Sequence, residues 1–122
     1  FVNDIYLIMA DKLKDLKIKT GVAKRCWKEY LSYKKECVNE QTKVEKMKTD
    51  GRDEYDIKKQ EEVLKETESM ISHTKSGFIK SWKEFQDIYT SAKNDENIKQ
   101  SNEYQEAEKV FNEITKAQQD DK

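Results

Sequence analysis

The chain has 122 residues, of which 24 are Lys or Arg and 25 are Asp or Glu, so its formal net charge is −1. This length allows one domain, and the balanced charge argues against a nucleic-acid binder, because the total enforces no strongly basic face and leaves only local lysine-rich patches open. Hydrophobic residues make up 34% and charged residues 40%, so a core can form only if the apolar residues are periodic. The sequence has no apolar stretch long enough to cross a membrane.

The N-terminal segment FVNDIYLI, residues 1–8, precedes a methionine at position 9. It is too short for the core of a signal peptide and lacks the basic flank. We interpret Met9 as the natural start and residues 1–8 as an upstream or non-native extension. The alternative is a native arm that docks on the domain. The domain then covers residues 9–118, and residues 119–122 form a loose polar tail.

A first long helix is predicted over residues 11–48, because apolar side chains recur there at steps of three and four. Thr20 and Gly21 interrupt the pattern, and since glycine costs about 1 kcal/mol in a helix, we expect fraying or a fresh start there. Cys26 and Cys37 are separated by about 16 Å of helix, too far for a disulfide. We expect both to be buried, reduced thiols, which is typical of a cytosolic protein. The apolar positions are Leu16, Val22, Ala23, Cys26, Trp27, Tyr30, Tyr33, Cys37, Val44 and Met47.

A sharp turn is predicted around Gly51, one of three glycines in a chain without proline. Lys46 and Lys48 suit the end of the first helix, Gly51 suits a left-handed cap, and Asp53 suits the N-cap of the next helix. A second helix is predicted over residues 56–92. A hairpin folded at this turn pairs residues whose numbers sum to roughly 104.

A third, shorter helix is predicted after a helix-breaking cluster at residues 94–97. Asn102 and Gln105 have the spacing of a capping box, and an apolar stripe follows from Tyr104 to Ala117. The predicted fold is therefore all-α: an antiparallel three-helix bundle, spectrin-like, in which a long helical hairpin carries a shorter third helix. The third helix covers one end of the hairpin, where most of the aromatic residues fall. At the other end, two helices alone leave apolar side chains partly exposed.

Catalytic and metal-binding patterns are missing from the sequence. His73, the single histidine, has no carboxylate or thiol at its helical neighbour positions. Three isolated glycines cannot form a phosphate-binding loop. We therefore expect no enzyme, no cofactor and no metal, and we interpret His73 as a boundary or surface residue.

Several stretches resemble the tubulin-folding cofactor A family, the tubulin-specific chaperones A. They are MAD at 9–11, LKIKTGVAKR at 16–25, VEKMKTDG at 44–51, YDIKKQEEVLKE at 55–66 and SNEYQEAEKVFNEI at 101–114. The resemblance implies a cytoplasmic, non-enzymatic protein that captures β-tubulin after its release from the cytosolic chaperonin and holds it for heterodimer assembly. It also implies a place beside the microtubule cytoskeleton. Members often carry a proline near the position of Ser72, so a kink expected there is in doubt.

An acidic client such as β-tubulin would be gripped by lysines around an apolar strip. For each basic residue, the alternative is a solvated charge. Competing functions are a self-associating coiled-coil module and, more remotely, a nucleic-acid binder. We expect a monomer or weak homodimer. The candidate partner-binding residues are Lys17, Lys19, Lys24, Arg25, Lys46, Lys48, Arg52, Tyr55, Ile57, Lys58, Lys59 and Val63.

Overall fold

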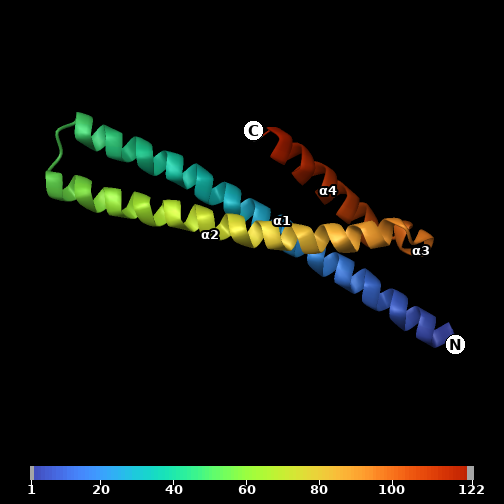
Figure 1. The fold of residues 1–122 in the computed structure, drawn as a ribbon. Coiled ribbons are helices and arrows are strands. Elements are labelled where there is room, and N and C mark those ends of the chain that lie inside the picture. The colour runs from blue at the N-terminus through green and yellow to red at the C-terminus, as the bar shows by residue number, and fades with distance from the viewer. Residues whose placement is uncertain (1, 121–122) are drawn as a thin grey trace. The chain divides into compact units, whose positions relative to one another are not determined.

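The computed structural model describes residues 2–120, and this part of the chain is helical without any strand. The helices are α1 (Val2–Thr49), α2 (Glu54–Lys93), the single turn α3 (Glu96–Lys99) and α4 (Asn102–Asp120) (Figure 1). The predicted all-α fold, a long helical hairpin with shorter helices, is confirmed. Residues 1, 121 and 122, which belong to the expected extension and tail, lie outside the described part.

The chain divides into two compact units, to which α1 and α2 both contribute. The first, here called the three-helix unit, contains the chain up to Trp27 and the chain from Ile79 onward, including α4. The second, here called the hairpin unit, spans Lys28–Phe78. Of the four helices, only α1 and α2 enter the hairpin unit.

The turn of the hairpin unit is built as the sequence predicts. Gly51 has a φ of 68°, in the left-handed region that glycine adopts without strain. The Arg52 amide donates to the Met47 carbonyl at 3.0 Å and the Gly51 amide to the Lys48 carbonyl at 3.2 Å, which together form a Schellman cap. The Asp53 carboxylate then accepts from the Tyr55 amide at 3.3 Å and starts α2. Figure 1 shows this reversal as the link between α1 and α2.

The predicted break at Thr20 and Gly21 is wrong, because α1 continues through both residues. Thr20 is buried, and its hydroxyl donates to the Leu16 carbonyl at 2.6 Å, so the side chain is satisfied within the helix. Leu16 and Ala23 on either side are almost fully buried. Their burial stabilises the helix by more than one interior glycine costs.

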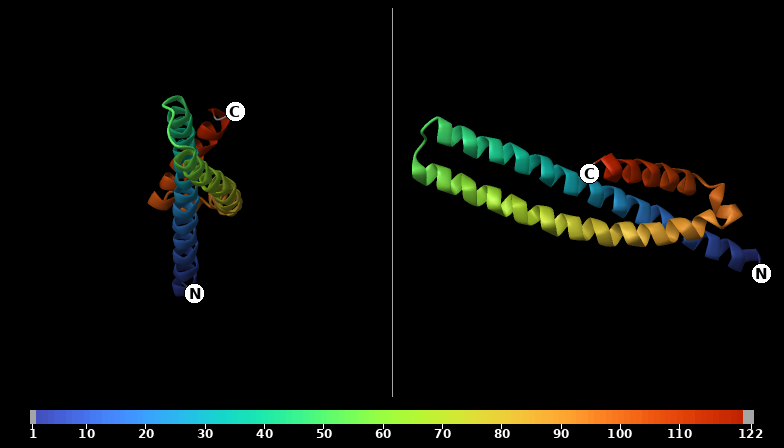
Figure 2. Two further views of the ribbon diagram at one scale, coloured as in Figure 1. Left: turned by 90° about the vertical axis from the view of Figure 1, so that its left-hand side faces the viewer. Right: turned by 45° about the horizontal axis from the view of Figure 1, so that its top comes forward.

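Aromatic rings form the core of the three-helix unit. Trp82 of α2 stacks on Phe111 of α4 at a centroid distance of 5.7 Å. Tyr89 of α2 lies 4.7 Å from Phe111 and 5.5 Å from Tyr104, both of α4. Phe85 is fully buried beside them. These contacts hold α4 against α2. Figure 2 shows α4 folding back from the end of α2.

The register of α1 against α2 follows the prediction in this unit. The Lys19 ammonium lies 3.2 Å from the Glu84 carboxylate, and these residue numbers sum to about 103, against the expected value of roughly 104. The contact places α1 and α2 in the antiparallel alignment that a turn at Gly51 requires.

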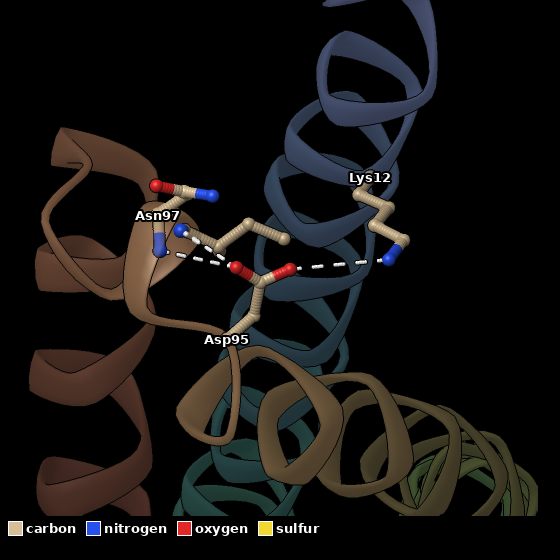
Figure 3. A network of polar contacts seen from close by, with 4 residues as sticks. Lys12, Asp95 and Asn97 are labelled. Atoms are coloured by element: carbon tan, nitrogen blue, oxygen red, sulfur yellow. Dashed lines mark hydrogen bonds and ion pairs between the residues drawn. The ribbon is translucent and has the colours of Figure 1, made fainter. Parts of the chain in front are cut away.

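The connection from α2 to α4 contains two N-caps, Asp95 for α3 and Ser101 for α4. The Asp95 carboxylate accepts from the amides of Asn97 and Ile98 at 3.1 and 3.4 Å and lies 3.9 Å from the Lys12 ammonium of α1 (Figure 3). The N-cap of α4 is Ser101, whose hydroxyl oxygen accepts from the Tyr104 amide at 3.1 Å. The predicted capping box at Asn102 and Gln105 is therefore wrong by one position.

The helix ends extend beyond the predicted ranges. Residues 2–8 continue α1, and Ile5, Tyr6, Leu7 and Ile8 are each more than half exposed. Whether residues 1–8 are an extension before a start at Met9 stays a prediction. At the other end, α4 runs to Asp120, two residues into the segment expected to be a loose tail.

Two interior glycines give a test of the helix energetics. A Cβ atom added at Gly21 or Gly77 would meet nothing within 4 Å. We expect Gly21→Ala and Gly77→Ala each to raise the free energy of unfolding by about 0.5–1 kcal/mol, because alanine loses less backbone entropy in a helix. Denaturant unfolding followed by circular dichroism measures this. Gly51→Ala is the control and should destabilise the chain, since its φ of 68° is left-handed. Equal effects at all three positions would contradict the expectation.

The buried phenol of Tyr89 should make the stability of the folded chain depend on pH at alkaline values. Burial raises the pKa of its phenol above the usual value of 10, and a hydrogen bond with Tyr104 raises it further. The unfolded chain therefore loses this proton first, so the stabilisation is complete below about pH 10 and is lost as the pH rises towards the folded-state pKa. Tyr89→Phe should cost about 1 kcal/mol at neutral pH through the lost hydrogen bond. In urea unfolding, the difference in the free energy of unfolding between the parent chain and Tyr89→Phe should become smaller at about pH 11. The same deficit at both pH values would rule out this role for Tyr89.

Candidate partner-binding surfaces

The twelve candidate residues divide between the two units, and each group is described by itself. Four belong to the three-helix unit and eight to the hairpin unit. The first group is Lys17, Lys19, Lys24 and Arg25, and the second is Lys46, Lys48, Arg52, Tyr55, Ile57, Lys58, Lys59 and Val63.

Two lysines of the first group are engaged within the three-helix unit. Lys19 pairs with Glu84 of α2 at 3.2 Å, and Lys24 pairs with Glu106 of α4 at 3.6 Å. Such exposed ion pairs are worth about 0–1 kcal/mol, so either lysine can exchange its partner at small cost. Lys17 and Arg25 are exposed.

An exposed stripe runs along α2 in the hairpin unit and is here called the Tyr55 stripe: Tyr55, Lys59 and Val63. Steps of four residues place these side chains on one face of the helix. Tyr55 is 63% exposed and Val63 is 43% exposed. The Lys59 ammonium lies 5.3 Å from the centroid of the Tyr55 ring, a cation–π contact that favours one position of the ring. The stripe is therefore an ordered apolar surface with a cation built into it.

The remaining candidates of the hairpin unit are less uniform. Ile57 is half-buried. Arg52 lies at the limit of an ion pair with Asp56, at 4.0 Å. Lys46, Lys48 and Lys58 are exposed. Partly exposed apolar residues are predicted for this region. Tyr55 and Val63 are exposed in this way, whereas Val44 is buried.

An open groove of about 630 Å³ lies in the hairpin unit between α1 and α2. Both helices line it with positions i, i+3, i+4 and i+7, so it follows the helix axes. Lys48 is the one residue of the candidate set that lines the groove. The sequence did not predict the groove, because its lining comes from two helices at once. The lining residues are Gln41, Val44, Glu45, Lys48, Glu61, Leu64, Lys65 and Glu68.

Two apolar residues of α1 were also missed. Leu31 is 39% exposed and Val38 is 59% exposed, and their separation of seven residues places them on one face. The sequence does indicate that they are exposed: both are apolar, but both fall outside the periodic apolar stripe that marks the buried face of the first predicted helix.

The groups considered for catalysis occupy positions with little reactivity. His73 is exposed, as expected of a surface residue. Burial raises the pKa of the Cys37 thiol, and the nearby carboxylates of Glu68 and Glu40 raise it further, so the thiolate is scarce at neutral pH. Cys26 is half-buried rather than buried, and both thiols are free.

Within residues 2–120, no three side chains of His, Cys, Asp or Glu gather as metal ligands would. None of the helices in that part of the chain has both the length and the apolar character that a membrane crossing demands.

Comparison with known proteins agrees with the fold. The family described as Tubulin binding cofactor A matches residues 11–111. Human tubulin-specific chaperone A is 36% identical over 107 residues, covering 87% of this chain and 96% of that protein. The crystal structure of tubulin folding cofactor A from Arabidopsis thaliana superposes with a TM-score of 0.76 at 33% identity, over 88% of this chain and 98% of that one. Human tubulin chaperone cofactor a gives a TM-score of 0.70 at 34% identity, over 85% and 98%. The chain therefore belongs to the tubulin binding cofactor A family.

Proposed function

We propose that this protein captures β-tubulin released from the cytosolic chaperonin and holds it until the heterodimer assembles. Membership of the family makes the chain a tubulin folding cofactor and not an enzyme, as the sequence predicts. The observation that carries the finer proposal is the Tyr55 stripe, an exposed apolar surface in a unit to which no third helix contributes.

The affinity of this capture is assigned to the apolar members of the stripe. Interfaces draw most of their binding energy from a few buried anchors, among which tyrosine is enriched. The Tyr55 ring is already oriented by Lys59, so less side-chain entropy is lost when a partner covers it. Val63, two turns along α2, extends the same surface, and Ile57 supports it from a half-buried position.

We assign the basic residues around the stripe to the electrostatic attraction of the client during association. Lys46, Lys48, Arg52 and Lys58 lie close in sequence to the turn at Gly51. Charges at an interface rim mainly raise the association rate and lose their effect in salt. An acidic client surface is the partner that they fit.

In the three-helix unit, Lys17, Lys19, Lys24 and Arg25 are proposed as a second basic contact with the same client. Lys19 and Lys24 would exchange Glu84 and Glu106 for carboxylates of the partner. We propose a cytoplasmic location at the microtubule cytoskeleton and no binding to nucleic acid or membrane.

A self-associating coiled-coil module is the second candidate, and the exposed Leu31 and Val38 on one face of α1 favour it. We propose that the free chain is nevertheless a monomer or at most a weak homodimer. Light scattering over a series of concentrations should give the monomer mass of 14.5 kDa in the dilute limit. A stable dimer at every concentration would support the coiled-coil module instead.

The capture itself is tested by retention of purified β-tubulin on the immobilised chain, with albumin as the control for nonspecific adsorption. Selective retention of tubulin is expected. Equal retention of both proteins would count against the proposed function.

The role of the stripe is tested with Tyr55→Ala combined with Val63→Ala. Both side chains are exposed, so helicity by circular dichroism should barely change, whereas tubulin capture should weaken by about tenfold or more. The matched control is Ile79→Ala, which also removes an exposed apolar side chain from α2 but lies in the three-helix unit. If the double variant captures tubulin as well as the Ile79→Ala control, the stripe is not the anchor.

A further inference from the structure

A second exposed stripe runs along α1 in the hairpin unit and is here called the Leu31 stripe: Lys28, Leu31, Lys35 and Val38. Steps of three and four residues place these side chains on one face of the helix. All four are exposed, and Val38 is the most exposed of the two apolar members, at 59%. The stripe therefore alternates lysines with apolar side chains over about 15 Å of helix. In heptad terms, the lysines occupy position a and the apolar residues occupy position d.

The lysines of the stripe have no counter-charge in the described part of the chain. Among residues 2–120, neither Lys28 nor Lys35 forms an ion pair. The glutamates nearest to them in sequence are Glu29 and Glu36, each one residue further along. One residue turns a side chain by about 100° around the helix axis, so these carboxylates lie off the stripe. The stripe is therefore a surface of net positive charge, and it is complementary to a partner that brings carboxylates.

A second copy of the chain does not supply those carboxylates. If two copies paired through this stripe, in either direction, the lysines of both copies would enter the interface and no carboxylate of the stripe would meet them. Like charges placed together at an interface oppose association. The alternation of lysine with Leu31 and Val38 therefore favours a different, acidic protein over a second copy.

The three-helix unit contains an example of the kind of segment that lies beside lysines of α1. The helix α4 is acidic, with five Glu or Asp residues against two lysines. Its buried side chains recur at helical steps and make it amphipathic. Glu106 of α4 lies 3.6 Å from the Lys24 ammonium of α1. Within that unit, a lysine of α1 is thus paired with a carboxylate of an acidic amphipathic helix.

We propose that the Leu31 stripe binds an acidic amphipathic helix of a protein partner. Leu31 and Val38, which are seven residues apart, pack against apolar residues at the same spacing in the partner helix. Lys28 and Lys35 each face a carboxylate of that helix, in the same chemistry as the pair of Lys24 with Glu106. The inference goes beyond the proposed function, because its surface belongs to α1 and does not include the Tyr55 stripe of α2.

The probe for this surface is a fluorescent synthetic peptide of about three heptads, with glutamate at each position a, leucine at each position d, and alanine and glutamine elsewhere. In a titration followed by fluorescence anisotropy, the peptide should bind the parent chain, and added salt should weaken the binding. Lys28→Glu combined with Lys35→Glu should weaken it by about tenfold or more. The same peptide with lysine in place of every glutamate should show the reverse preference and bind this variant but not the parent.

The matched control is Lys43→Glu combined with Lys75→Glu. It makes the same change in net charge at two exposed lysines of the hairpin unit that lie outside the stripe, so it should bind the glutamate peptide almost as the parent does. The apolar contribution is tested with Leu31→Ala combined with Val38→Ala, which should weaken binding by about tenfold. All the substituted side chains are exposed, so helicity by circular dichroism should barely change.

Failure of the parent chain to bind the glutamate peptide, or an equal loss in the stripe and control lysine variants, would overturn the inference. If the stripe lysine variant does not fold, the alanine variant decides: weaker binding supports the stripe, and unchanged binding overturns it. A dimer of the parent chain that Leu31→Ala with Val38→Ala dissociates would also overturn it, since a second copy would then be the occupant.

Discussion

The stacking of α4 on α2 is the interaction on which the rest of the structure depends. Tyr89 and Trp82 of α2 meet Tyr104 and Phe111 of α4 and close a core around Phe85. With 19 residues, α4 contributes to the three-helix unit alone. The hairpin unit therefore has two helical segments to bury its apolar side chains, and two segments leave part of each apolar face uncovered. Tyr55 and Val63 are among the apolar side chains that stay exposed in this unit.

On the proposed function, the same arrangement lets the chain hold a client without catalysing a reaction. A holding protein needs a stable scaffold and a surface that binds strongly enough to protect the client yet releases it on assembly. The aromatic core supplies the scaffold. In the proposal, exposed apolar side chains supply the binding surface, and the lysines beside them change the association rate more than the affinity.

Much of the fold could be predicted because it is specified locally. Gly51 and Asp53 fix the turn, and the apolar period fixes the helices on either side. The errors arise where tertiary contacts decide. The helix passes Gly21 because Leu16 and Ala23 are buried around it, and Ser101 rather than Asn102 caps α4. The groove in the hairpin unit needs two helices in register, which the periodicity along one helix does not reveal. The family resemblance was readable from the motifs, but its motifs do not show which side chains remain exposed.

A crosslinking map of the complex with β-tubulin tests the central claim most directly, that exposed side chains of the hairpin unit hold the client. Lysines are distributed over both units, so one lysine-reactive crosslinker reports on each. The account predicts crosslinks from Lys46, Lys48, Lys58 and Lys59 to tubulin. Crosslinks found only at Lys109 and Lys116 of α4, with those four lysines as reactive as in the free chain, would contradict it.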